Sequence, residues 1–322
     1  MSGRWDRRGF LKRLGVGCAG IAGASAIGVA ARDRGRDEPL FVRRAKQVRD
    51  FGYGLDLPTG ELVVAHGDAR EATRGAIEAL GGMKRFVRSG ESVVIKPNVG
   101  WDRTPVQAAN THPEVVAELV SMCLEAGAGR VTVTDNTCNE PGRCFTRSGI
   151  WKASEKAGAE VVLPAEHRFR QFDLGGVVLG RMPVLAPAVT ADRLINVPIA
   201  KHHGLCGFTG AMKNLYGVLG GRRNRLHQRI HHSIADLTDF ARATLTVMDA
   251  TRVLLRNGPQ GGDVGDTERV DQVIAAVDPV AVDAFSCSLI GLSPPDLEYL
   301  SLAAERGLGS ADPSSLDLRE VS

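Results

Sequence analysis

The sequence predicts an α/β protein with a mostly parallel sheet and Rossmann-like layers of helices on both faces. Short runs of consecutive apolar residues recur along the 322-residue chain and alternate with segments of helical spacing. Apolar runs without polar alternation are typical of strands buried on both faces, and helices between them supply the crossovers that parallel strands need. Hydrophobic residues make up 43% of the chain and charged residues 24%, which excludes a disordered or collagen-like protein.

The expected elements follow in chain order. Apolar runs predict strands at 62–65, 93–95, 131–134, 194–197, 245–248 and 273–277. Helical spacing predicts helices over 70–88, 113–126, 279–290 and 295–305. Thr111 is the expected N-cap of the second helix, with Glu114 completing a capping box, and Asp278 is the expected N-cap of the third.

The N-terminus has the layout of an export signal. Arg7-Arg8 with Phe10 and Leu11 resembles the twin-arginine signal, and an uncharged stretch then runs to Ala31. We therefore expect recognition by the twin-arginine export machinery, cleavage after residue 31 and an exported, periplasmic or extracytoplasmic protein. The alternative is a signal that is retained as a membrane anchor. No other segment is apolar enough to span a membrane.

The rest of the chain divides into three parts. Residues 32–58 are charged and lack periodicity, which predicts a tether or an N-terminal wrap. Residues 59–310 form the α/β domain, and 311–322 a C-terminal tail. Residues 1–31 carry five basic side chains and one acidic, so the net charge of +3 becomes −1 without them. A near-neutral body gives no electrostatic footprint for nucleic acid, so we exclude that class of partner.

Polar residues lie at the carboxyl ends of four of the predicted strands. They are Lys96 and Asn98, Asp135 and Asn136, Asn196 with Lys201 and His203, and Asp249. Ligands of open α/β sheets bind beyond the carboxyl ends of the strands, so we expect these residues to share one rim and to bind a cofactor or a small-molecule ligand. The alternative for each single residue is a cap or turn.

A glycine-rich segment at 201–214 is the densest group of polar residues. Gly204, Gly207 and Gly210 recur every third residue, and Lys201, His203, Lys213 and Asn214 surround them. Such a loop lets backbone N–H groups approach an anion, and the lysines would add charge. It lacks the order of a Walker loop. A plain glycine-rich turn between strand and helix is the alternative.

Histidines and cysteines raise the question of a metal. His227 and His231 are four residues apart and would share one face of a helix, and Cys206 is a further candidate ligand. A polar, basic helix face is the alternative. Cys138 and Cys144 would form a disulfide or bind a metal in an exported protein. No cysteine cluster of the ferredoxin type is present in the sequence.

Two further candidates lie near the C-terminus. Asn257 belongs to the run Asn-Gly-Pro-Gln-Gly-Gly-Asp, which is too rich in glycine for regular structure and would close over a ligand or simply connect two elements. Asp283 is a carboxylate within an apolar helix. It faces the site in one interpretation and is a buried, hydrogen-bonded residue in the other.

Several of these motifs, in this order, resemble the family described as domain of unknown function 362. They are Val94-Ile95-Lys96-Pro97-Asn98, Asn196-Val197-Pro198 with Lys201 and His203, Thr209-Gly210-Ala211-Met212-Lys213-Asn214, His227, Asn257-Gly258-Pro259 and Asp278 to Asp283, and the match spans about 60–308. Many members resemble iron–sulfur proteins through an attached ferredoxin module, which the present sequence does not contain.

The order of His203, Lys213 and His227 also resembles the nickel-pincer lactate racemases. That resemblance implies a pyridinium-derived nucleotide attached to Lys213, nickel bound by His227 and acid–base chemistry at His203. A cofactor of this kind takes a hydride from the carbon of a 2-hydroxy acid and returns it. The resemblance also implies a second acid–base histidine, for which His202, His231 and His232 are the candidates.

Three functional hypotheses follow. The first is an enzyme that holds a nickel-pincer-type nucleotide or another transition-metal cofactor and acts on a small polar substrate through Lys201, His203 and Lys213. The second is a non-catalytic exported protein that binds a metal or an anion with the same residues. The third is an iron–sulfur-associated redox protein.

Overall fold

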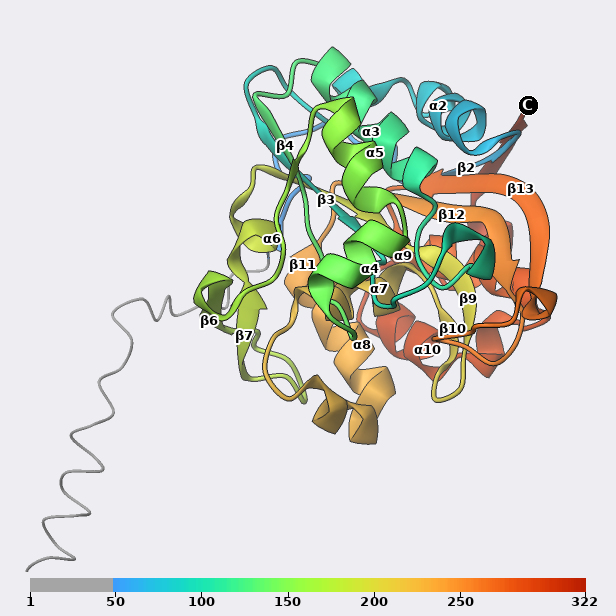
Figure 1. The fold of residues 1–322 in the computed structure, drawn as a ribbon. Coiled ribbons are helices and arrows are strands. Elements are labelled where there is room, and N and C mark those ends of the chain that lie inside the picture. The colour runs from blue at the N-terminus through green and yellow to red at the C-terminus, as the bar shows by residue number, and fades with distance from the viewer. Residues whose placement is uncertain (1–48) are drawn as a thin grey trace, which may run out of the picture. The chain divides into compact units, whose positions relative to one another are not determined.

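A computed structural model describes residues 49–322, and its main feature is one large mixed sheet (Figure 1). Eight strands follow the order β14-β2-β13-β12-β8-β3-β4-β5. Only β13 runs antiparallel to both of its neighbours, and the other pairs along this path are parallel. The strands are β2 (Glu61–His66), β3 (Ser92–Pro97), β4 (Arg130–Val133), β5 (Glu160–Val161), β8 (Arg193–Val197), β12 (Leu245–Leu254), β13 (Thr267–Ala276) and β14 (Asp317–Val321).

Helices cover both faces of this sheet, as the sequence predicts. Alternate residues of one strand enter different cores: Val93 and Ile95 of β3 lie in one buried cluster, and Val94 lies in the other. The first cluster includes α2 (Ala69–Ala79), α3 (Pro113–Glu125), α4 (Pro141–Arg147) and α5 (Ile150–Ala157). The second includes α6 (Ala186–Thr190), α7 (Ala211–Asn214), α8 (Ile230–Phe240), α9 (Pro279–Ser286) and α10 (Glu298–Glu305). The predicted fold class is therefore confirmed.

Three predicted boundaries are wrong for local reasons. The helix predicted over 70–88 ends at Ala79, since Gly81 and Gly82 follow with positive φ. The N-cap of α3 is His112, whose Nδ1 accepts a hydrogen bond from the Glu114 N–H, while the Thr111 hydroxyl donates to the Val197 carbonyl instead. Strand β12 does not end before Asp249 but continues to Leu254, where it pairs with β13 on one side. Asp278 caps α9 as predicted, accepting from the Val280 and Ala281 N–H groups.

The two ends of the described chain both pack on the domain. The segment expected to be a C-terminal tail contains β14, which pairs in parallel with β2 and forms the edge of the sheet. At the other end, β1 (Arg49–Asp50) pairs with β11 (Ala241–Arg242), and the side chain of Phe51 is buried. The expected signal and most of the expected tether lie outside the described residues. In residues 49–322, no helix is both long and apolar enough to cross a bilayer.

A hairpin at the end of β8 leads into the candidate site. After Pro198 the chain continues as β9 (Ile199–His203), which turns back through β10 (Gly207–Thr209). Strand β9 also pairs with the extended part of β12. A second, separate hairpin is formed by β6 (Phe169–Asp173) and β7 (Arg181–Leu185). The β9–β10 hairpin thus places residues 201–209 beyond the carboxyl ends of β3 and β8.

Candidate functional site

A cavity of about 450 Å³ lies beyond the carboxyl ends of β3 and β4. The β9–β10 hairpin and the segment from α7 to the following short helices complete its wall. Its lining residues are Asn98, Gly100, Trp101, Asp135, Asn136, Cys138, Lys201, His203, Gly204, Leu205, Thr209, Lys213, Asn214, Tyr216, Gly217, Arg223, His227, Gly258 and Pro259. The polar ends of β3 and β4 and much of the predicted 201–214 segment therefore meet at one place, which Asp249 does not line.

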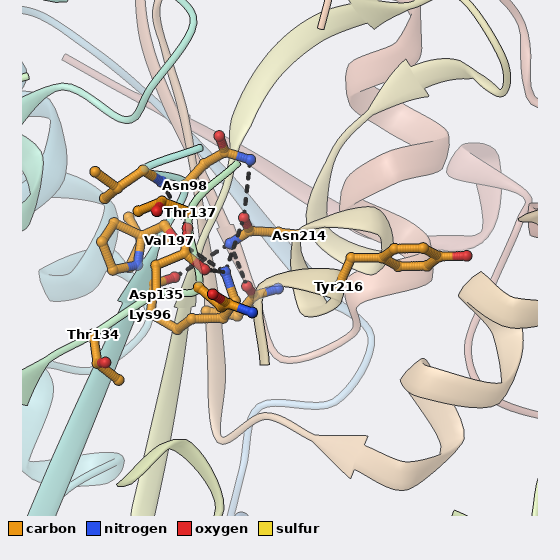
Figure 2. A network of polar contacts seen from close by, with 12 residues as sticks. Lys96, Asn98, Thr134, Asp135, Thr137, Val197, Asn214 and Tyr216 are labelled. Carbon is orange, nitrogen blue, oxygen red and sulfur yellow. Dashed lines mark hydrogen bonds and ion pairs between the residues drawn. The ribbon is translucent and has the colours of Figure 1, made fainter. Parts of the chain in front are cut away.

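Lys96 is buried beside this cavity, and its ammonium contacts three oxygen atoms of the protein (Figure 2). Its Nζ lies 2.7 Å from Asp135 Oδ1 and donates to the Pro97 carbonyl at 3.0 Å and to Asn214 Oδ1 at 3.2 Å. An ammonium group has three N–H donors, and two of them make hydrogen bonds here. The contact with Asp135 is an ion pair, since Asp135 Oδ1 accepts no hydrogen bond within the described residues. Burial lowers the pKa of Lys96, and the Asp135 carboxylate opposes this shift. Lys96 therefore supplies charge and position rather than a reactive group.

Asn214 is the centre of the polar network that Figure 2 shows. Its Oδ1 accepts hydrogen bonds from Lys96 Nζ and from Asn98 Nδ2, at 3.1 Å for the latter. Its Nδ2 donates to the Lys96 carbonyl and to Asn196 Oδ1. An amide side chain has two donors and two acceptor positions, so Asn214 is satisfied. It joins β3, β8 and α7 at the cavity wall.

Lys201 is also buried but differs from Lys96 in its partners. Its Nζ donates to Asn98 Oδ1 at 3.0 Å and to the Ala109 carbonyl at 2.5 Å. Burial lowers the pKa of Lys201 to about 7, with a further contribution from the positive charge of Lys213. The neutral amine would keep both of these donors and still hold a free lone pair. Lys201 can therefore exchange a proton near neutral pH without losing its position.

Lys213 has no hydrogen-bond acceptor within residues 49–322. Its Nζ lies 3.8 Å from the centre of the Tyr216 ring, and the ring of His227 stacks parallel to Tyr216 at 6.4 Å. Burial lowers the pKa of Lys213, and it also lowers the pKa of His227, which the charge of Lys213 lowers further. An amine with a lowered pKa and no acceptor is suited to nucleophilic attack or covalent attachment.

His203 is held in one orientation by the main chain. The backbone N–H of Leu205 donates to its Nδ1 at 3.1 Å, and only 5% of the residue is exposed. Burial lowers the pKa of His203 to about 3, and the nearby lysines act in the same direction. The imidazole is therefore neutral at physiological pH.

The cavity carries an excess of basic groups. Lys201, Lys213 and Arg223 line it together with two histidines, whereas its acidic residue, Asp135, is paired with Lys96. The guanidinium of Arg223 donates to the carbonyls of Asn136 and Thr137, which hold its charge at the wall. Such a site favours a ligand with negative charge.

Asp283 occupies the place where an anion was expected in the glycine-rich segment. Its carboxylate accepts hydrogen bonds from the Ala211 N–H at 2.5 Å and the Met212 N–H at 3.1 Å. A Cβ on Gly210 would lie 2.0 Å from Asp283 Oδ1, so the glycine makes this approach possible. Burial raises the pKa of Asp283 to about 7. The chain's own carboxylate thus fills this backbone cradle.

Four other predicted cofactor or metal residues lie outside the cavity lining. Gly207 lies next to Leu297. Cys206 is buried, and its thiol donates a hydrogen bond to the Phe208 carbonyl. The Asn257 side-chain amide donates to the Asp266 carboxylate. Asp249 is buried where β12 continues, and its carboxylate accepts from the His112 N–H at 2.6 Å and from Thr251. Within the sequence-predicted set, Asn98, Asp135, Lys201, His203, Gly204, Lys213, Asn214 and His227 line the cavity.

The predicted metal ligands do not converge. His227 lies in a 3-10 helix over Arg223–Arg229 and His231 in α8, so they are not on one continuous helix face. His231 instead stacks on Tyr299 and lies 3.8 Å from Glu298. Across residues 49–322, no group of three or more His, Cys, Asp or Glu side chains could hold a metal ion. A site built from protein ligands alone is therefore not supported there.

Several lining residues were not singled out from the sequence. Trp101, Tyr216 and Arg223 contribute to the wall, and each lies close in sequence to a motif that was recognised. Thr209 also lines it; it begins the motif Thr209 to Asn214 but was not predicted as a site residue. Cys138 also lines the cavity. It and Cys144 are free thiols in the structure rather than a disulfide. Proximity to the polar strand ends was the available signal for Trp101 and Cys138.

Comparisons with known proteins place the chain in a family. The thylakoid-associated protein sll1697 of Synechocystis is 25% identical over 261 residues, covering 78% of each protein. Two solved structures align at low identity: a Thermotoga maritima protein (12%, TM-score 0.41, 70% of this chain) and the lactate racemase apoprotein of Thermoanaerobacterium thermosaccharolyticum (15%, TM-score 0.42, 71% of this chain). This chain spans only 60% and 56% of those two structures. The model of the family described as Domain of unknown function (DUF362) matches residues 93–288, and the chain belongs to that family.

Proposed function

We propose that the chain is an enzyme that binds a small organic anion, such as the carboxylate of a 2-hydroxy acid, in the cavity. The observation that carries this proposal is the pairing of a basic lining with an unbonded amine. Lys213 has a lowered pKa and no hydrogen-bond acceptor among the described residues, while Lys201 and Arg223 lie in the same wall. Lys96, in contrast, has two hydrogen-bond acceptors and an ion-pair partner in the protein.

The hydrogen bonds of each residue indicate its role in the proposed reaction. Lys201 moves a proton, because two of its donors are fixed and its pKa is about 7. Lys213 supplies the nucleophilic amine. Asn98 orients Lys201, and Asn214 in turn orients Asn98. His203 contacts the substrate from the hairpin.

The residues present fit a nucleotide of the nickel-pincer type at two points. Lys213 would hold it covalently, since its amine has no competing acceptor, and His227 would provide a nitrogen ligand beside the same Tyr216 ring. When bound, such a group supplies hydride acceptance and return at the carbon that bears the substrate hydroxyl. The pincer brings its own ligands for the metal, which agrees with the absence of a three-residue protein site across 49–322.

The N-terminal sequence adds a proposal about location. The twin-arginine route carries folded proteins and is often used when a cofactor is inserted in the cytoplasm. Export by this route, with loading of the cofactor beforehand, would account for the presence of Arg7-Arg8 in a chain with this cavity.

The test is to purify the protein from a host with twin-arginine export, without a histidine tag or chelator. Elemental analysis and peptide mass spectrometry should find nickel and an adduct on Lys213, and Lys213→Ala should lose the adduct and any racemisation of lactate. Lys152→Ala, on an exposed helix face, is the matched control. An adduct that persists in Lys213→Ala would refute the attachment. Tight anion binding without an adduct or turnover would favour a non-catalytic binding protein.

A further inference from the structure

The β9–β10 hairpin presents three polar side chains on one face. Residues two apart in a strand point to the same side, so Lys201 and His203 share a face of β9. Thr209 of β10 pairs directly with Lys201, and Gly207 pairs with His203. All three residues line the cavity. Since Gly207 has no side chain, nothing from β10 stands directly opposite the His203 ring.

Thr209 has a buried hydroxyl without a partner. Only 3% of the residue is exposed, and its Oγ1 makes no hydrogen bond within the described part of the chain. A buried hydroxyl left unpaired costs free energy, so an unpaired one that faces a cavity points to a ligand that completes it. An oxygen atom of a bound ligand could accept a hydrogen bond from the Thr209 hydroxyl.

The tautomer of His203 follows from its main-chain contact. The Leu205 N–H donates to Nδ1, so Nδ1 carries the lone pair and the single proton of the neutral ring is on Nε2. Nε2–H has no acceptor among residues 49–322. A neutral ring of this tautomer has no free lone pair, and taking up a proton at Nδ1 would break the bond to Leu205.

We propose that the Nε2–H of His203 and the hydroxyl of Thr209 form an oxygen-binding pair for the carboxylate or carbonyl oxygen of the substrate, and that His203 donates a hydrogen bond rather than acting as a base. This inference rests on the proposed function for the identity of the ligand. It changes the role that the racemase resemblance gives to His203. Proton transfer then belongs to Lys201, which lies opposite Thr209 on the same hairpin face.

The first experiment measures the tautomer directly on the full-length protein. Long-range ¹H–¹⁵N NMR of histidine-labelled protein, assigned with His203→Gln, should show a protonated Nε2 and an unprotonated Nδ1 from pH 5 to pH 8. Adding oxamate, an unreactive carboxylate of similar size to lactate, should shift the Nε2–H resonance. A free Nε2 lone pair, or an imidazolium at pH 6, would overturn the donor role.

The second experiment measures the affinity for oxamate by calorimetry. Thr209→Val keeps the shape but removes the hydroxyl, and should weaken binding about five- to tenfold, the effect of one neutral hydrogen bond. Thr209→Ser should restore most of the affinity. His203→Leu should weaken binding more than His203→Gln, whose amide keeps a donor. Unchanged binding in both Thr209→Val and His203→Leu would refute the oxygen-binding pair.

The two proposals fail in distinguishable ways. Wild-type protein that does not bind oxamate at all would contradict the proposed function, and the NMR spectra would still decide the tautomer of His203. Wild-type binding that neither substitution alters would leave the anion site standing and remove only the hairpin pair.

Discussion

Two neighbouring regions of the site use the same residue types in opposite ways. Around Asn214, Lys96 has two hydrogen-bond acceptors and an ion-pair partner, and every side-chain donor and acceptor position of Asn214 has a protein partner. On the β9–β10 hairpin, the Thr209 hydroxyl lacks one, and nearby Lys213 has no acceptor among the described residues. Satisfied polar groups hold a structure in place, while unsatisfied ones facing a cavity are available to a ligand. The comparison separates the residues that position the site from those that act in it.

The largest expected effect comes from breaking the satisfied region. Lys96→Met leaves the Asp135 carboxylate buried without its partner, so we expect the free energy of unfolding to fall by about 3–5 kcal/mol. Urea denaturation followed by circular dichroism measures this loss. Replacing both partners, in Lys96→Met with Asp135→Leu, should recover part of the stability. A loss no greater than that of exposed Lys152→Met would show that the pair is not structural.

The second large effect that we expect is a pH dependence of stability caused by Asp283. The pKa of Asp283 is about 7 in the folded protein, against an ordinary value of 3.8. Between pH 4 and pH 7 the Asp283 carboxyl is therefore protonated in the folded state and ionised in the unfolded state. The contribution to stability is full below about pH 4 and is lost as the pH rises through 7, by up to ~4 kcal/mol.

Asp283→Asn tests this by removing the titrating group. The variant should be less stable at low pH, because the amide Nδ2 cannot accept from a backbone N–H, whereas the hydroxyl oxygen of the protonated carboxyl keeps that capacity. It should also lose the fall in stability between pH 4 and pH 7. Denaturation curves from pH 4 to pH 7 measure this loss, with exposed Asp317→Asn as the control. A pH profile of stability equal to that of the wild type would show that Asp283 is not the titrating group.

A substitution at Gly217 tests the packing around the Lys96–Asp135 ion pair without removing either charge. A Cβ at this position would lie 1.8 Å from Asp135 Oδ1 and 2.6 Å from Lys96 Nζ. Gly217→Ala should therefore displace the buried ion pair and cost about 1–3 kcal/mol, as overpacking usually does. Gly180→Ala is the matched control, since no atom lies within 4 Å of its added Cβ. Equal melting temperatures for the two variants would contradict the close approach.

The sequence predicted the fold and the convergence of polar strand ends, because both follow from local pattern. Lys96 and Asp135 each follow or end an apolar run, and parallel strands bring such positions to one edge. Asp283 was less predictable, since its partners Ala211 and Met212 lie about seventy residues away. Asp249 was misplaced because apolar residues alone did not show that β12 continues past it. Within residues 49–322, Lys213 Nζ has no hydrogen-bond acceptor and Thr209 Oγ1 has no hydrogen bond. Such absences depend on residues distant in sequence, so no local pattern predicts them.

The smallest predicted effect concerns the titration of Lys201. Its pKa of about 7 means that the ammonium form predominates below pH 7 and the amine above it. Affinity for oxamate should therefore fall as the pH rises from 6 to 8, by up to about tenfold. Lys213 and Cys138 also face this group and influence its charge. Asn98→Leu removes an acceptor that favours the ammonium form, and should move the midpoint to lower pH.

Calorimetric titrations at several pH values measure this midpoint, with exposed Asn224→Leu as the control. A midpoint that moves in Asn98→Leu while the affinity at pH 6 changes little would mark Asn98 as a positioning residue for Lys201. A midpoint equal to that of the wild type would place the titration on another group, with Lys213 the next to test. In that case Lys201 would belong with the residues that position the site, because it already gives two of its donors to protein acceptors. Lys213 would then be the lysine that acts on the ligand.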